Sequence, residues 1–229
     1  MTKNYLADGY LVPADRTARL AEKIVARLPH LKFAVWDLSE FLHFFHNVRR
    51  TMIFIECENI ARNEVMSVIA NDSEFGGCVV YNGGRKPKTV NEKWASAKSI
   101  DEIREVIVIV SRKDFTETVP LSKGPKTNDN IRIPSIERGL VDLLAYSLRE
   151  WLPIPVSEVV NVVSGLAKEH RLKYGTLSRY ATRRYVAWYL NIVLYKLHEK
   201  KYIPSNAIDP RHLEAGKRNL DAIQEVENQ

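Results

Sequence analysis

Apolar residues recur along the first half of the chain with the spacings of helices and strands. Helical spacing begins after Pro13 and stops at Pro29, and a second helix is expected from Ser39 to the pair Arg49 and Arg50. The other elements expected here are strands over residues 31–36, 52–58, 78–81 and 106–110, and a helix over 65–69. Strands and helices therefore alternate in this half.

The run at residues 106–110 is the most apolar in the chain, which is typical of a strand buried on both faces. We therefore expect it at the centre of the sheet. Alternating strands and helices of these lengths predict an α/β layered domain with a small sheet, either mixed or parallel. The pattern alone does not separate those two arrangements.

The pattern changes in the second half. Residues 122–130 contain glycine, proline and asparagine and predict a loop. Helical spacing then dominates, with helices expected over residues 135–151, 156–169, 177–200 and 213–226. We therefore expect two parts, which are an α/β domain over residues 1–130 and a helical C-terminal subdomain over 131–229 that packs on it or continues it.

Charge changes this picture because it is concentrated in one place. The formal net charge is +6, yet residues 166–201 hold nine Lys and Arg against two Glu, a local excess of +7. Arginine can hold phosphate or carboxylate oxygens with two N–H groups at once, whereas a solvated helix face is the alternative. The residues expected to bind nucleic acid or a partner are Lys173, Arg179, Tyr180, Arg183 and Arg184. The aromatic residues that follow, such as Tyr185 and Trp188, are expected in the core.

Several kinds of function are not indicated by the sequence. No stretch approaches 18 consecutive apolar residues, so no membrane span is predicted. Glycine-rich phosphate-binding motifs and the GxSxG nucleophile motif are absent, so no cofactor and no catalytic residue are expected. Cys57 and Cys78 are too few for a disulfide framework, and no signal-peptide pattern opens the chain, so we expect a cytoplasmic protein.

Two groups of residues remain as candidates for metal binding. His43 and His46 are three residues apart, but their aromatic neighbours favour packing, so no metal is expected there. Asp37, Glu56 and Glu58 lie near expected strand ends, where carboxylates can hold the divalent ion of a hydrolytic nuclease. Solvent-facing or helix-capping roles are the alternative for these acids. A metal-dependent nuclease is therefore the second functional hypothesis.

Residues 132–144 predict the start of a structural helix. Ser135 suits the N-cap, and Glu137 suits the first turn, where the helix dipole favours an anion. Asp142 falls in a helix that otherwise turns toward the core. We expect its carboxylate to pair with a nearby base or backbone donor, because a buried unpaired carboxylate is costly.

Four blocks in their order along the chain resemble the AbiEi-like antitoxins of prokaryotic type IV toxin–antitoxin and abortive-infection systems. The blocks are FAVWDLS at residues 33–39, FIECE at 54–58, PSIERGLVDL at 134–143 and GTLSRYATRR at 175–184. Together they extend the resemblance over about residues 13 to 200. In that family a winged helix-turn-helix usually precedes the first block. Here about thirty residues precede it, which is room for one helix.

The resemblance implies a non-enzymatic antitoxin or a derived regulator. Its partner would be a nucleotidyltransferase-like toxin, or the DNA or RNA of its own operon. The arginine-rich block carries Arg179, Tyr180, Arg183 and Arg184 over as interface candidates, and it carries over no catalytic residue. A structural interaction protein derived from the same family is a further alternative, and the oligomeric state is not predicted.

Overall fold

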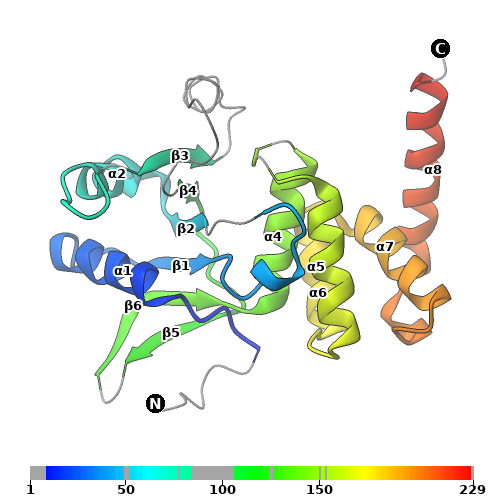
Figure 1. Cartoon of the computed structure of the whole chain (residues 1–229), viewed down its shortest axis with the longest axis horizontal. Helices are drawn as coiled ribbons and strands as arrows, with labels where there is room; N and C mark the ends of the chain where they lie inside the picture. The colour runs from blue at the N-terminus through cyan, green and yellow to red at the C-terminus, as the bar shows by residue number, and fades with distance from the viewer. Residues whose placement is uncertain are drawn as a thin grey trace. The chain divides into compact units, whose positions relative to one another are not determined.

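The computed structural model describes residues 9–48, 52–76, 78–83, 106–123, 126–149, 151–152 and 154–227 (Figure 1). The chain divides into two compact units, Met1–Ile136 and Glu137–Gln229. The expected boundary after residue 130 is a few residues too early, because it falls inside the last strand of the first unit. In the part of the chain that the structure describes, no helix is both long and apolar enough to cross a membrane.

A mixed sheet forms the first unit, with its described strands in the order β3-β4-β2-β1-β6-β5. The strands are β1 (Phe33–Asp37), β2 (Met52–Cys57), β3 (Val79–Gly83), β4 (Val106–Ser111), β5 (Thr118–Lys123) and β6 (Lys126–Pro134). β1 pairs with β2 and β5 pairs with β6 in antiparallel fashion, whereas the other neighbours are parallel. The predicted α/β layered architecture is therefore confirmed. Of the two sheet types that the sequence left open, mixed and parallel, the sheet is mixed.

Helices α1 (Asp15–Arg27) and α2 (Arg62–Ala70) pack against one face of this sheet. Leu20 and Ile24 of α1 lie one turn apart and are fully buried, as the helical spacing predicts. Val65 and Ile69 repeat the arrangement on α2. These side chains meet the alternate residues of the inner strands, and together they form the core of the unit.

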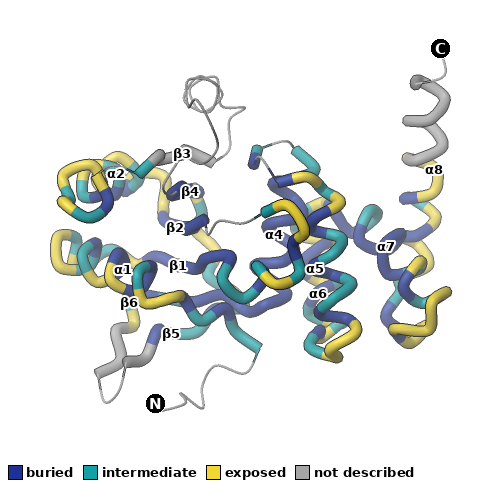
Figure 2. The backbone as a smooth tube through the Cα atoms, viewed as in Figure 1, coloured by how far each residue is buried: buried dark blue, intermediate teal, exposed yellow. Residues whose placement is uncertain are grey.

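Strand β4 is buried on both faces, as its apolar run predicts, since residues Val106 to Val110 are all buried (Figure 2). It is an inner strand, but the centre of the sheet is the pair β2 and β1. On the face away from α1 and α2, Trp36 stacks on Phe54 with ring centroids 4.0 Å apart and rings 9° from parallel. The Trp36 indole N–H donates to Glu56 Oε1 over 3.1 Å.

Two local predictions for this unit are wrong. The helix expected from Ser39 is only the short 3-10 helix η1 (Leu42–Phe44), because the Asp37 carboxylate accepts the Ser39 N–H and starts a turn. Arg49 and Arg50, expected to close that helix, lie outside the described residues. Of the loop expected over 122–130, residues 122–123 belong to β5 and residues 126–130 to β6, which pair with each other, while residues 124–125 lie outside the described residues.

The second unit is helical, as expected. Its helices are α4 (Ile136–Leu148), α5 (Val156–Lys168), α6 (Tyr174–Arg183), α7 (Ala187–Glu199) and α8 (Pro210–Glu227). The single helix expected over 177–200 is wrong, because the backbone turns at Tyr185, whose φ is 59°. Tyr185 is 82% exposed rather than in the core. The break therefore separates a basic helix, α6, from a largely buried one, α7.

The start of α8 is held firmly against α7. The buried Asn191 side chain of α7 accepts the Asp209 N–H over 2.7 Å. Asp209 and Pro210 are an N-cap and first-residue pair, and the Asp209 carboxylate accepts the Arg211 N–H over 3.0 Å. Further along α8, a Cβ on Gly216 would lie 2.6 Å from the Trp188 carbonyl oxygen, so this approach of the two backbones needs glycine.

Burial raises the pKa of the Cys57 thiol from 9.0 to about 11. The thiolate is the reactive form, so we expect iodoacetamide to alkylate the half-buried Cys78 well before Cys57 in the folded protein at about pH 8. Because folding raises this pKa, the contribution of the neutral Cys57 thiol to the free energy of unfolding is fully present below pH 9.0. It is lost as the pH rises toward 11, where the thiol ionises in the folded state as well. Labelling followed by mass spectrometry checks this, with denatured protein as the control. Equal rates at both cysteines in the folded protein would contradict it.

Candidate nucleic-acid or partner interface

Helix α6 carries cations on its exposed side and apolar residues on its buried side. Arg179 and Arg183 are both exposed and lie one turn apart, and Lys173, at the N-cap, is exposed as well. Leu177 and Ala181 are fully buried on the other side. The sequence of α6, YGTLSRYATR, contains no acidic residue that could neutralise these cations within the helix. We define Lys173, Arg179 and Arg183 as the α6 basic face.

The buried side of α6 contacts an ionic network centred on Asp142 of α4. The Asp142 carboxylate is fully buried, and it lies 2.8 Å from Arg184 Nε and 3.9 Å from Arg138 Nε. The Tyr180 hydroxyl donates to Asp142 Oδ2 over 3.5 Å. The expectation that Asp142 pairs with a base is therefore confirmed. The network brings together side chains from α4 and from the end of α6.

Other contacts fix the two ends of α6. The Glu137 carboxylate, also buried, accepts the Lys173 N–H over 2.8 Å and so caps the start of the helix from a distant element. At the other end, Arg149 donates to the Arg184 carbonyl over 3.1 Å. Desolvation and then the nearby Arg184 charge lower the pKa of Arg149. The α6 basic face is therefore presented by a helix that is held at both ends.

The five residues expected at the interface divide into two groups. Tyr180 is buried, with 4% of its surface exposed, so the expectation that it lies on the surface is corrected. The Arg184 side chain is 23% exposed and pairs with the buried Asp142. Lys173, Arg179 and Arg183 are exposed, and Arg179 and Arg183 lie one turn apart on α6. Sequence reasoning missed Arg138, Glu137 and Arg149 as the residues that position α6. The four-residue spacing of Arg138 and Asp142 in an otherwise largely apolar helix could have pointed to an internal ion pair.

The turn between α6 and α7 is as short as the turn of a helix-turn-helix motif. In such motifs the second helix presents its side chains to the major groove. Here the second helix is α7, and Leu190, Asn191 and Leu194 at its middle are buried. The exposed arginines, Arg179 and Arg183, lie on the first helix instead. This arrangement favours contacts with a charged backbone or surface over the reading of base edges by α7.

The three carboxylates of the nuclease hypothesis do not form a cluster. Asp37 is paired in register with Ile53, whereas Glu56 is paired with Ala34, so the two acids lie toward opposite ends of β1 and β2. Asp37 accepts the N–H groups of Ala14 and Ser39 over 2.9 Å each. Glu56 lies 3.5 Å from Arg112. Glu58 is exposed beyond the end of β2.

Metal-binding geometry is likewise absent from the described residues. No group of three or more His, Cys, Asp or Glu side chains among them could hold a metal ion. The His43 ring lies against the Phe44 ring, with centroids 3.8 Å apart, and both belong to η1. His43 therefore packs against an aromatic neighbour in this structure.

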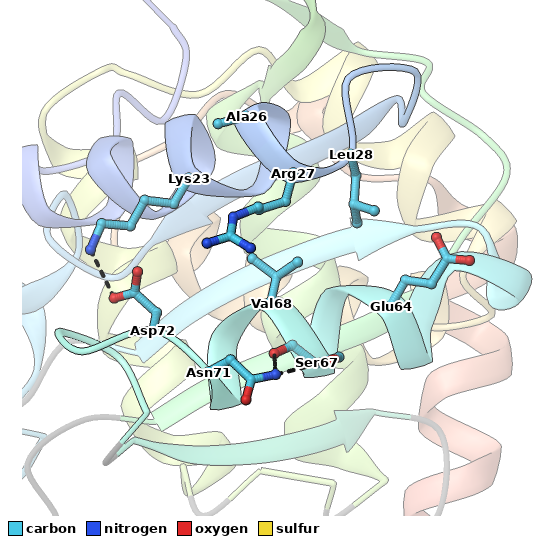
Figure 3. Close-up of a pocket in the computed structure, with 9 residues that line it drawn as sticks. All are labelled: Lys23, Ala26, Arg27, Leu28, Glu64, Ser67, Val68, Asn71 and Asp72. Carbon is cyan, nitrogen blue, oxygen red and sulfur yellow. Dashed lines mark hydrogen bonds and ion pairs between the residues drawn. The ribbon is translucent and has the colours of Figure 1, made fainter.

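A groove of about 470 Å³ lies between α1 and α2 (Figure 3). Lys23 and Asp72 form an ion pair of 2.8 Å at one end, and this pair lowers the pKa of Asp72. Arg27 extends toward Val68 across the groove, and Glu64 lies at the other end (Figure 3). Two cations and two carboxylates therefore line it. Because they balance, the groove offers no net charge to a ligand, unlike the α6 basic face.

Residues 12–200 match the model of a family of unknown function, DUF6577. The chain belongs to this family. The DUF6577 match covers the sheet of the first unit and, in the second, α4 to α7 with the α6 basic face. No curated protein and no solved structure matches the chain.

Proposed function

We propose that this DUF6577 protein is a non-enzymatic, antitoxin-like regulator that binds an anionic partner through the α6 basic face. The observation that carries the proposal is the exposure of Lys173, Arg179 and Arg183 on a helix without acidic residues. Guanidinium groups pair with phosphate or carboxylate oxygens through two N–H groups. The resemblance of the four blocks to AbiEi-like antitoxins supplies the biological setting.

The partner we propose is a nucleotidyltransferase-like toxin, or the DNA or RNA of the operon that encodes both proteins, in the cytoplasm. A nucleotidyltransferase-like gene is then expected beside the gene for this chain. The metal-dependent nuclease receives less support, because Asp37 and Glu56 lie apart and Glu56 faces Arg112. A structural interaction protein would use an interface that does not depend on these cations.

Reversing the charge of the α6 basic face with the double substitution R179E/R183E is expected to weaken nucleic-acid binding by more than about tenfold. Both side chains are exposed, so the free energy of unfolding should change by no more than about 0.5 kcal/mol. Fluorescence anisotropy with a labelled DNA duplex and a labelled RNA hairpin measures the binding. Thermal unfolding of each variant measures the stability.

The matched control is the double substitution K196E/K200E, which has the same four-residue spacing and the same change in net charge. Lys196 and Lys200 are exposed at the end of α7 and outside the α6 basic face. If binding depends on total charge alone, both doubles will weaken it equally, and the α6 basic face has no special role. If binding depends on this face, K196E/K200E will retain most of the affinity.

A further inference from the structure

A groove of about 620 Å³ lies beside the α6 basic face, between the start of α6 and the start of α8. Its lining includes Tyr174, Ser178, Arg179, Asn206, Asp209 and Arg211. Arg179 belongs both to this groove and to the α6 basic face, so the two features are continuous. Gly175 also lines the groove. A Cβ atom added to Gly175 would have no other heavy atom within 4 Å, so the space beside this residue is open.

Two guanidinium groups from different helices line this groove, and Asp209 is the one carboxylate among the described residues that line it. Asp209 is already engaged, because Arg211 Nη2 lies 3.2 Å from Asp209 Oδ2 and Arg211 Nε lies 3.4 Å from Oδ1. The hydrogen bond from Arg211 lowers the pKa of Asp209, so the carboxylate stays charged at neutral pH. Arg211 therefore already holds one planar anion supplied by the chain itself.

Hydroxyl groups accompany the two arginines. Ser178 offers one, and Tyr174 offers a second whose pKa is raised by burial, so it remains a protonated donor at neutral pH. Arginine together with hydroxyl side chains is the composition that contacts phosphate oxygens in nucleic-acid complexes. The groove is also open to solvent rather than enclosed, so an extended chain of phosphates could reach the two arginines.

We propose that this groove binds backbone phosphates of a nucleic acid through Arg179 and Arg211, and that Asp209 competes with the phosphate for Arg211. The inference rests on the proposed function and names the ligand of the same surface. The α6 start is capped by Glu137 and the α8 start by Asp209, so the guanidinium groups, rather than open helix ends, provide the attraction. The carboxylate of an acidic protein would be the alternative ligand.

Asp209 allows a substitution whose effect has the opposite sign. Asn caps a helix as well as Asp does, so D209N keeps the start of α8 intact while removing the charge that engages Arg211. We therefore expect D209N to bind nucleic acid several-fold more tightly than the wild type. R211Q should bind more weakly. A merely structural role for this pair would weaken binding in both variants.

Salt titration counts the phosphate contacts. The full chain and each variant are titrated with a labelled mixed-sequence DNA duplex and an RNA hairpin between about 50 and 200 mM salt. Loss of one duplex phosphate contact lowers the slope of log Kobs against log salt by about 0.9, which is the change expected for R211Q. R218Q is the matched control, because Arg218 is exposed on α8 and is not among the groove residues. Comparing the duplex with the hairpin distinguishes DNA from RNA as the source of the phosphates.

The inference fails if R211Q keeps the wild-type slope or if D209N binds more weakly than the wild type. It also fails if polyglutamate competes as well as nucleic acid does, since the ligand would then be a carboxylate. Those results would leave the proposed function intact, provided that R179E/R183E still abolishes binding of the partner. The proposed function itself falls if R179E/R183E binds its partner as the wild type does.

Discussion

Replacing Asp142 with alanine is expected to lower the free energy of unfolding of the C-terminal unit by about 3–5 kcal/mol. Asp142 and Arg138 are both fully buried, and Arg184 is drawn onto the same carboxylate at 2.8 Å. D142A removes from the interior a carboxylate that lies 3.9 Å from Arg138 Nε and 2.8 Å from Arg184 Nε. Because a domain is stable by only about 5–15 kcal/mol, this loss is a large fraction of the total. Urea unfolding followed by circular dichroism measures it.

The comparison that isolates the charge is the double substitution R138M/D142L. Removing both partners of a buried pair and filling the space with apolar side chains is often close to neutral. We therefore expect the double variant to be more stable than D142A alone. D142A within about 0.5 kcal/mol of the wild type would contradict the view that this network holds α6 in place.

Replacing Glu56 with alanine is expected to destabilise the first unit by a similar amount, about 3–5 kcal/mol. The Glu56 carboxylate is 1% exposed and lies 3.5 Å from the guanidinium of Arg112, which is 8% exposed. It also accepts the Trp36 indole N–H. E56A takes this acceptor from two buried donors at once. Urea unfolding of E56A and of E56Q, which keeps an oxygen for Trp36, should give the larger loss for E56A.

Glu56 also separates the two functional hypotheses. We expect E56Q to lower the stability of the protein but to remove no nuclease activity, because the buried Glu56 carboxylate is paired with Arg112. Incubating the wild type with labelled DNA and RNA in Mg²⁺ or Mn²⁺ provides the readout. Metal-dependent cleavage by the wild type that disappears in a folded E56Q variant would revive the nuclease and overturn this interpretation.

Regular periodicity made much of the fold predictable. The apolar residues of α1 follow one helical stripe, and Pro13 and Pro29 mark the two ends of that pattern, so this helix could be predicted. The apolar run of β4 likewise predicts a strand that is buried on both faces. The β5–β6 hairpin escaped prediction because its sequence is rich in polar and turn-forming residues. Its place in the sheet depends on the backbone pairing of β6 with β1, a strand almost a hundred residues away in sequence.

The candidate interface was predictable only in part. Arg179 and Arg183 are one turn apart, so the sequence predicts correctly that they share a face. The helical pattern continues through residues 184–186, so it did not reveal the turn at Tyr185. That Asp142 needs a base followed from its apolar surroundings, but the choice of Arg184 depends on how α4 and α6 pack. The Asp209–Pro210 pair, by contrast, was a local helix-start pattern and could have been used to place α8.

We propose that the α6 basic face makes this chain an antitoxin-like regulator. To test this, a nucleotidyltransferase-like gene found beside the chain's own gene is induced in cells together with the chain, and growth is measured. We expect the wild type and K196E/K200E to restore growth and R179E/R183E, present at the same level and folded, not to restore it. Restoration of growth by R179E/R183E, or failure of the wild type to restore it, would rule out this role for the α6 basic face.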